Sequence, residues 1–174
     1  MTLLWARRLE IGPLRGVNVD LQAGLTLITG DEGCGTTLLL RVLAGQVTPD
    51  EGDVGGGPCL LLSAAPGDEW SPAEVVTDTL GAHALVDERL AGRQLGSMSS
   101  GERQRVRLAR TLMDEDAAVL LLDEPFGYLD GAGSLALLNA LRVDGRPALI
   151  VAKASEVAPE SADRVLTLVD GQLG

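Results

Sequence analysis

The sequence predicts an α/β fold with a mostly parallel sheet that helices cover on both faces. The first observation is a series of short apolar runs that alternate with helical segments, which is typical of buried parallel strands. The second is composition: 45% of the 174 residues are hydrophobic, as in a globular chain. The third is a glycine-rich turn, residues 30–37, between an apolar run and a helical run. We expect one domain over residues 1–174, because this length fits a single core and no linker or repeat divides it.

Six segments have the patterns of strands. Residues 17–21 alternate apolar and polar side chains, which is typical of a strand with one buried face. The others are mostly apolar, and several are continuous enough to be buried on both faces. The predicted strands are Val17–Leu21, Leu25–Thr29, Cys59–Ser63, Val119–Asp123, Ala148–Ala152 and Arg164–Val169. Between them, Asp50–Gly57 is expected to be a glycine-rich turn region and Ala64–Pro72 a loop.

Five segments are predicted to be helical. The strongest is Gly101–Met113, which carries several arginines on one side and apolar residues on the other. The segment after the glycine-rich turn is apolar enough to be a buried helix, and two in the middle of the chain are short. The predicted helices are Leu38–Ala44, Ala73–Leu80, Val86–Leu90, Gly101–Met113 and Ser134–Leu141.

Charge and composition argue against several classes of function. The formal net charge of −11 disfavours nonspecific binding to nucleic acid or to an anionic membrane. No apolar run reaches the length of a membrane span, and the first eight residues place their charges after the apolar ones, unlike a signal peptide. Cys34 and Cys59 are far apart with no cluster of histidines, so neither a disulfide framework nor a zinc site is expected. We therefore expect a cytoplasmic protein and no nucleic-acid partner.

The turn at residues 30–37 matches the phosphate-binding pattern G-x-x-x-x-G-K-[ST] except for its lysine. Gly30 and Gly35 are in register and Thr37 fills the last position, but Thr36 stands where the lysine would be. Backbone N–H groups at the start of the following helix can still hold phosphates. The candidate nucleotide-binding residues are Gly30, Asp31, Glu32, Gly33, Cys34, Gly35, Thr36 and Thr37. The alternative is an ordinary glycine-rich turn from strand to helix.

Two adjacent carboxylates end the apolar strand in Val119–Pro125, which reads VLLLDEP. Asp123 could hold Mg²⁺ together with the hydroxyl of Thr37, and Glu124 could act as a base that polarises an attacking water. The alternative is a strand followed by a solvated acidic turn.

A capped helix begins near Gly101, where the chain reads MSSGERQRV from Met98. Ser99 and Ser100 can cap it, and the cap together with the helix dipole favours an anion. The alternative is an ordinary capped, basic, amphipathic helix.

Together these three segments resemble the ATP-binding cassette family, from about Leu14 to the C-terminus. MSSGERQRVRLARTL resembles its signature helix, LLLDEPFGYLD its second nucleotide motif and D-loop, and TTLLLRVLAGQVTPDEGDV the stretch after its phosphate loop. The resemblance implies a P-loop NTPase fold with N-terminal antiparallel strands and a helical subdomain, here shortened to about residues 66–112.

The same resemblance implies ATP and Mg²⁺ as ligands, bound between two chains of a homodimer or heterodimer. One chain would supply the loop and carboxylates, and the other its signature, here Ser99, Ser100, Gly101 and Glu102. A membrane permease is a further partner that the family implies, which would place the protein at the inner face of a membrane. The shortened middle segment leaves that partner open.

The chain departs from the family around the outer phosphates. Besides Thr36, the expected glutamine is absent from Ser63–Pro66, and Lys153 stands where the family has a histidine. Lys153 is the only lysine in the chain, and His83, the only histidine, is expected at the surface of the middle segment. We hypothesise that Lys153 supplies a catalytic cation to the outer phosphates. The alternative is a lone surface lysine.

Three functions remain open on the sequence. The first is an ATPase subunit with an impaired or rewired site, which binds Mg-ATP and hydrolyses it slowly. The second is a non-catalytic module that keeps the fold and assembles with a partner. The third is a cassette protein without a permease, acting on a soluble machine.

Overall fold

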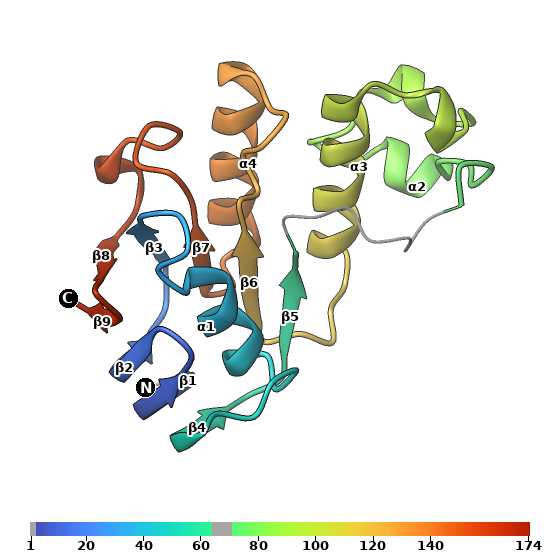
Figure 1. Cartoon of the computed structure of the whole chain (residues 1–174). Coiled ribbons are helices and arrows are strands. Elements are labelled where there is room, and N and C mark those ends of the chain that lie inside the picture. Colours follow the sequence, from blue (N-terminus) through green and yellow to red (C-terminus); the bar gives the residue numbers. More distant parts are fainter. Residues whose placement is uncertain (1–2, 64–70) are drawn as a thin grey trace.

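A computed structural model describes residues 3–63 and 71–174, and its central sheet has six strands (Figure 1). The first five strands in the order below run parallel, and the short last one is antiparallel to its neighbour. In spatial order they are β5 (Cys59–Leu62), β6 (Val119–Asp123), β7 (Ala148–Val151), β3 (Leu25–Gly30), β8 (Arg164–Val169) and β9 (Gln172–Leu173). The mostly parallel sheet predicted from the apolar runs is confirmed.

A smaller antiparallel sheet consists of β2 (Leu14–Leu21), β1 (Leu4–Ile11) and β4 (Glu51–Gly56), in that order. The antiparallel N-terminal strands implied by the resemblance are thus present. The prediction of a turn region at Asp50–Gly57 is wrong, because β1 provides a partner for a strand there. Gly55 pairs with Trp5, and a Cβ on Gly55 would lie 2.6 Å from the Trp5 ring. Glycine is required by this contact and does not mark a turn.

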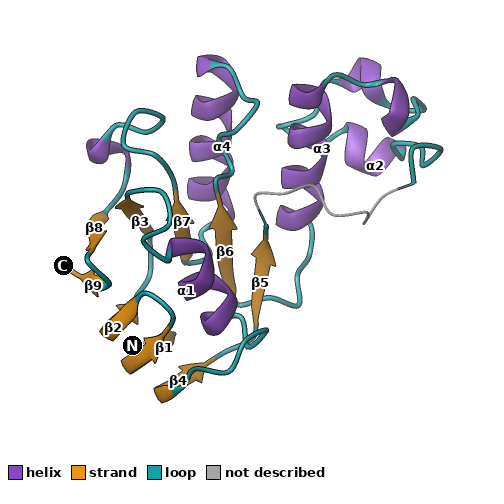
Figure 2. Cartoon of the chain, viewed as in Figure 1, coloured by secondary structure: helices purple, strands orange, loops and turns teal. Residues whose placement is uncertain are grey.

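Helices cover both faces of the central sheet (Figure 2). One face packs on α1 (Thr36–Leu43) and on the small sheet, through side chains that include Leu39, Leu40 and Leu121. The other face packs on α3 (Ser100–Leu112) and α4 (Gly131–Asp144), with alternate residues of β6 such as Leu120 and Leu122 pointing to it. Successive side chains of β6 point to opposite faces of the sheet, so β6 contributes residues to the hydrophobic cores on both faces.

The helix α4 is longer than the predicted Ser134–Leu141. The Asp130 side chain accepts a hydrogen bond from the Gly133 N–H at 2.7 Å and so caps the helix three residues earlier, before a glycine-rich first turn. Gly145 ends the helix at a φ of 75°, in the left-handed region that glycine adopts freely.

The middle segment has less helix than predicted. The helix expected over Ala73–Leu80 is wrong: Val75 forms an isolated antiparallel bridge with Gln94, and α2 (Asp78–Gly81) begins only after the cap Thr77. The helix expected over Val86–Leu90 is a 3₁₀ turn, Glu88–Leu90, and a second one covers Leu95–Ser97. The predicted loop Ala64–Pro72 lies mostly outside the described residues.

The short turns of the middle segment bury their apolar side chains against α3, through residues that include Val76, Leu85, Leu90, Leu95 and Met98. Within the described ranges, no helix combines the length and apolarity needed to cross a bilayer.

Candidate functional site

The loop at residues 31–35 leaves β3 and enters α1 at the carboxyl edge of the central sheet (Figure 1). The Cys34 N–H donates to the Asp31 carbonyl at 3.1 Å, which closes the turn. Gly35 precedes the helix with a φ of 106°, and a Cβ there would lie 2.8 Å from Cγ of Pro13. Only glycine fits this position, because both its backbone conformation and its neighbour exclude a side chain.

The start of α1 presents backbone N–H groups to solvent. The first N–H groups of a helix have no intrahelical acceptor, and no side chain caps α1. The apolar side chains of Leu39, Leu40, Val42 and Leu43 anchor the helix in the core. This end of α1 can therefore bind an anion with N–H groups and the positive end of the helix dipole.

A cavity of about 300 Å³ joins this loop to the ends of two neighbouring strands. Its lining residues come from the loop, from the residue after β6 and from the exit of β7: Gly30, Asp31, Glu32, Gly33, Thr36, Thr37, Glu124, Val151, Ala152 and Lys153. The predicted loop residues Cys34 and Gly35 do not line it, and Cys34 packs against the core instead. The structure thus brings the loop, Glu124 and Lys153 together.

Thr37 and Asp123 form an oxygen pair beside this cavity. The Thr37 Oγ1 lies 3.3 Å from Oδ1 of Asp123, which ends β6 and is 3% exposed. In the described part of the chain, no group of three or more His, Cys, Asp or Glu side chains could hold a metal. One carboxylate and one hydroxyl fit Mg²⁺ that takes its other ligands from water and phosphate oxygens, which is its usual mode of binding beside a nucleotide.

Glu124 is exposed and has a φ of 47°, a conformation that is uncommon for a residue with a side chain. Its N–H donates to the Val151 carbonyl at 2.8 Å, which ties the exit of β6 to β7. Such backbone conformations persist only where the surroundings hold them, and they gather at functional sites.

Lys153 follows β7 and is exposed. Its backbone N–H donates to Oε2 of Glu156 at 3.3 Å, which closes a short turn. Among the described residues, no ion pair engages its ammonium group. Within the described ranges, a cation without a carboxylate partner therefore lines the same cavity as Thr36.

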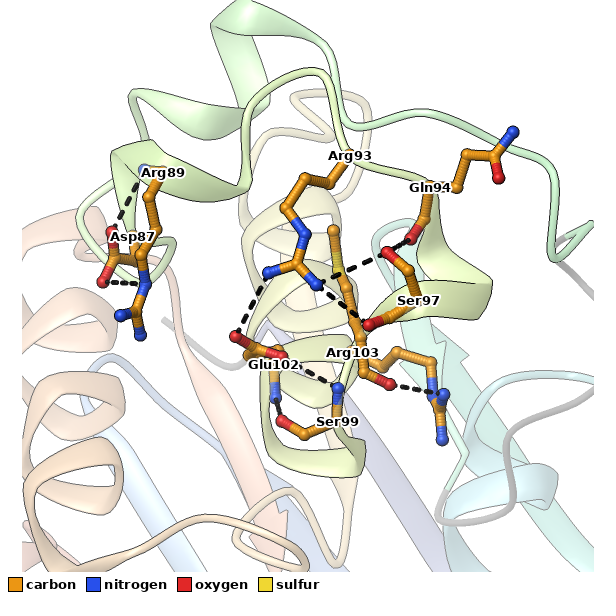
Figure 3. Close-up of polar contacts among 9 residues, drawn as sticks. Asp87, Arg89, Arg93, Gln94, Ser97, Ser99, Glu102 and Arg103 are labelled. Carbon is orange, nitrogen blue, oxygen red and sulfur yellow. Dashed lines mark hydrogen bonds and ion pairs between the residues drawn. The ribbon is translucent and has the colours of Figure 1, made fainter.

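The predicted signature residues begin α3 in a capping box (Figure 3). The Glu102 N–H donates to Oγ of Ser99 at 3.2 Å, and the Ser99 N–H donates to Oε2 of Glu102 at 2.8 Å. The hydrogen bond from the Ser99 backbone N–H is the main reason that the pKa of Glu102 lies below its ordinary value. Arg93 contacts the residues around the cap. Its guanidinium donates to the Ser97 carbonyl at 2.9 Å and lies 3.8 Å from Oε1 of Glu102.

The signature lies apart from the loop. Ser99, Gly101 and Glu102 line a separate cavity of about 390 Å³ with Arg105 and Tyr128, and no signature residue lines the loop cavity. Figure 1 shows α3 on the β5 side of the sheet, away from β3 and its loop. Within one chain, the two predicted binding elements do not meet.

Several polar residues near these sites were not found from the sequence. Gln104 and Arg107 are both 6% exposed and carry hydrogen bonds inside the molecule. The spacing Gln104, Leu108, Thr111 follows the buried face of α3 and is the signal that could have revealed Gln104.

His83, expected at the surface of the middle segment, is half-buried. Its Nδ1 accepts the Leu85 N–H at 3.2 Å, and burial lowers its pKa.

Comparison with known proteins identifies the class to which this fold and these motifs belong. Residues 63–127 match the family model described as ABC transporter. The chain is 31% identical to aliphatic sulfonates import ATP-binding protein SsuB 2 of Pseudomonas aeruginosa, over 92% of this chain and 68% of that protein. It is 33% identical to phosphonates import ATP-binding protein PhnC 1 of Natronomonas pharaonis, over 92% of this chain and 84% of the relative.

Solved structures with a similar fold are also ABC transporter cassettes. The dimeric structure of MJ0796, a bacterial ABC transporter cassette, superposes with a TM-score of 0.81 at 18% identity, over 98% of this chain and 96% of that one. The chain belongs to the ABC transporter family, as one of its ATP-binding subunits, and has the P-loop NTPase fold of the cassettes.

Proposed function

We propose that this subunit binds Mg-ATP at residues 30–37 and hydrolyses it slowly at an interface between two chains. The observation that carries the proposal is the single cavity that the loop shares with Glu124 and Lys153, while the signature lines another. A site that needs both elements must then be completed by a second chain.

Each part of the loop cavity has a role in this proposal. Backbone N–H groups at the start of α1 hold the phosphates, and the hydroxyl of Thr37 and the carboxylate of Asp123 hold Mg²⁺. The metal, when bound, neutralises negative charge that develops on the phosphate oxygens. Glu124 accepts a proton from the attacking water, since it is exposed at the edge of the cavity.

Slow turnover follows from Thr36. Loss of a positioned donor to transition-state charge typically lowers a rate by about 10²–10³-fold, and the loop lacks its lysine. The acidic side chains of Asp31 and Glu32 also line the cavity and act in the same direction. Lys153 compensates in part, as a cation from the exit of β7.

The proposed domain is one nucleotide-binding unit over residues 1–174, with a reduced helical subdomain at about 66–112. A second copy or another chain of the family would be its dimer partner, as supported by the dimeric cassette of the same fold. With an unlike partner, one complete site would combine the partner's loop with Ser99–Gly101 of this chain. The similarity to import proteins supports a membrane permease as a further partner, with the subunit at its cytoplasmic side.

A non-catalytic module is the second candidate, and the threonine at position 36 is the observation that favours it. Such a protein would keep the fold and the dimer contact without turnover.

Turnover distinguishes the two candidates. We expect phosphate release from Mg-ATP by the parent, and release at least about 10²-fold slower from Glu124→Gln, because the amide cannot accept the proton of the water. Glu160→Gln is the control, since Glu160 is exposed on the 3₁₀ turn Pro159–Ser161 and does not line the cavity. Equal background rates for parent and Glu124→Gln would establish the non-catalytic module instead.

A further inference from the structure

A series of buried and partly buried hydrogen bonds connects Ser63, just after β5, through α3 to the turn after β6. Arg107 donates through Nη2 to the Ser63 carbonyl at 3.1 Å and through Nη1 to Oε1 of Gln104 at 3.1 Å. Gln104 in turn donates through Nε2 to the Pro125 carbonyl at 3.0 Å. Pro125 directly follows Glu124, so the last of these hydrogen bonds reaches the Pro125–Phe126 peptide, one peptide beyond the proposed base.

Arg107 determines how the Gln104 amide is oriented. A guanidinium has only donors, so the amide must turn its oxygen towards Arg107 and its NH₂ group towards Pro125. Both side chains are 6% exposed, in a helix whose other buried residues are apolar apart from Thr111 and include Val106, Leu108 and Ala109. Burial of an amide and a guanidinium is unfavourable unless their hydrogen bonds are satisfied, so an apolar pair would be the simpler core. The polar pair therefore calls for a role besides packing.

Glu124, which lies beside the end of this series of hydrogen bonds, has a strained backbone conformation. Glu124 has a φ of 47°, and three hydrogen bonds restrain three successive peptide groups, from Asp123–Glu124 to Pro125–Phe126. Its N–H donates to Val151 at 2.8 Å, its carbonyl accepts the Gly127 N–H at 3.2 Å, and the next carbonyl accepts from Gln104. The bond from Gln104 is the only one of the three that a side chain supplies, and so the one that a substitution can remove.

We propose that Gln104, oriented by Arg107, is a positioning residue that keeps Glu124 aimed at the loop cavity. Neither side chain lines that cavity, so both act through the Glu124–Pro125 backbone. The proposal rests on Glu124 being the base of the proposed ATPase. In this proposal α3 serves two sites. It begins with the signature Ser99–Glu102, and its Gln104 holds the turn that carries Glu124.

The decisive variant is Gln104→Glu. It keeps the size of the side chain and an oxygen for Arg107, whose charge favours the ionised carboxylate, but an ionised carboxylate cannot donate to Pro125. We expect amide hydrogen exchange at Gly127 to become about 10-fold faster, as the turn opens locally, while the amides of β6 and β7 keep their protection. We expect kcat to fall about 10-fold with KM within about 2-fold, since a small misplacement of a reacting group lowers rate more than binding.

Two substitutions at position 107 test the orienting role. Arg107→Met removes the donors to Ser63 and Gln104 and should reproduce the faster exchange at Gly127, while Arg107→Lys keeps a cation and should restore part of the protection. Arg110→Met is the matched control on the same helix, because Arg110 is half-exposed and pairs with Glu74 at the surface. It should leave exchange at Gly127 unchanged.

The proposal is overturned if Gln104→Glu leaves both the exchange at Gly127 and kcat at the parental values. It is equally overturned if that variant speeds exchange throughout β6 and β7 and weakens nucleotide binding as much as turnover, because the pair would then support only the fold. Should the parent release no phosphate, the proposed ATPase fails, and exchange at Gly127 alone still decides whether Gln104 holds the turn.

Discussion

Individual residues around the loop cavity differ from the usual phosphate site in a correlated way. Thr36 removes a cation from the loop, and Lys153 adds one from the exit of β7. Lys153 is exposed, and within the described residues its ammonium group has no carboxylate partner in an ion pair, so it is available to an anion. Relative to the usual phosphate site, the lysine is therefore absent at position 36 and present at position 153. Both positions line the same cavity, so the cavity keeps one lysine.

Replacement of Lys153 by alanine should weaken Mg-ATP binding by about 10–100-fold, because a hydrogen bond to a charged group is worth about 1.5–3 kcal/mol. Calorimetric titration with Mg-ATP measures the change. Lys153→Arg keeps the charge and serves as the control. Thr36→Lys should rescue Lys153→Ala, since it returns a cation to the loop. Parental affinity and turnover in Lys153→Ala would show that the lysine is only a surface residue.

At the scale of elements, α3 combines three tasks. Its N-terminus is the signature with its capping box, its buried face carries Gln104 and Arg107, and its Arg105 lies 3.0 Å from Asp130, the cap of α4. The helix that begins with the capping box therefore also contacts the turn that follows β6. The stability of this helix end is a measurable quantity in its own right.

Loss of the capping hydroxyl in Ser99→Ala should lower the free energy of unfolding by about 1 kcal/mol, the usual effect of removing an N-cap side chain. Chemical denaturation followed by circular dichroism measures it. Ser155→Ala is the control, because Ser155 is an exposed serine outside any helix. Equal stabilities of the parent and Ser99→Ala would mean that the cap contributes nothing to the fold.

At the scale of the whole molecule, Arg146 ties together the ends of α3 and α4. Its guanidinium donates to the carbonyls of Leu112, Asp114 and Ala117 and pairs with Asp144 at 2.7 Å. Both side chains of the pair are less than one-fifth exposed. The hydrogen bond from Arg146 is the main reason that the pKa of Asp144 lies below its ordinary value.

Arg146→Met should lower the free energy of unfolding by about 2 kcal/mol at neutral pH, since it leaves the mostly buried Asp144 carboxylate without its cation. Because folding lowers the pKa of Asp144, its stabilisation is present above the ordinary carboxyl pKa and is lost as the pH falls through the lowered one. The difference between parent and variant should therefore shrink in acid. Denaturation midpoints of parent and Arg146→Met across that pH range measure it.

The exposed Arg142 on α4 provides the control, and Arg142→Met should change stability by less than about 0.5–1 kcal/mol. A difference between parent and Arg146→Met that stayed constant with pH would show that Asp144 does not carry the effect.

The sequence by itself determined the parallel strands, the glycine loop and the two long helices, because hydrophobic period and glycine placement are local signals. Its predictions failed at Asp50–Gly57 and Ala73–Leu80, where distant partners, β1 and Gln94, decide the conformation. The predictions about which residues bind nucleotide remain predictions, since they concern a ligand.

Only the tertiary structure decided which side chains meet. Lys153 and Thr36 are more than a hundred residues apart in the sequence, and they share a cavity because β3 and β7 are parallel neighbours whose carboxyl ends face the same edge. The contact of Gln104 with the turn after Glu124 likewise depends on how α3 packs against the end of β6. Such contacts follow from the pairing of strands and the packing of helices, which no local pattern encodes.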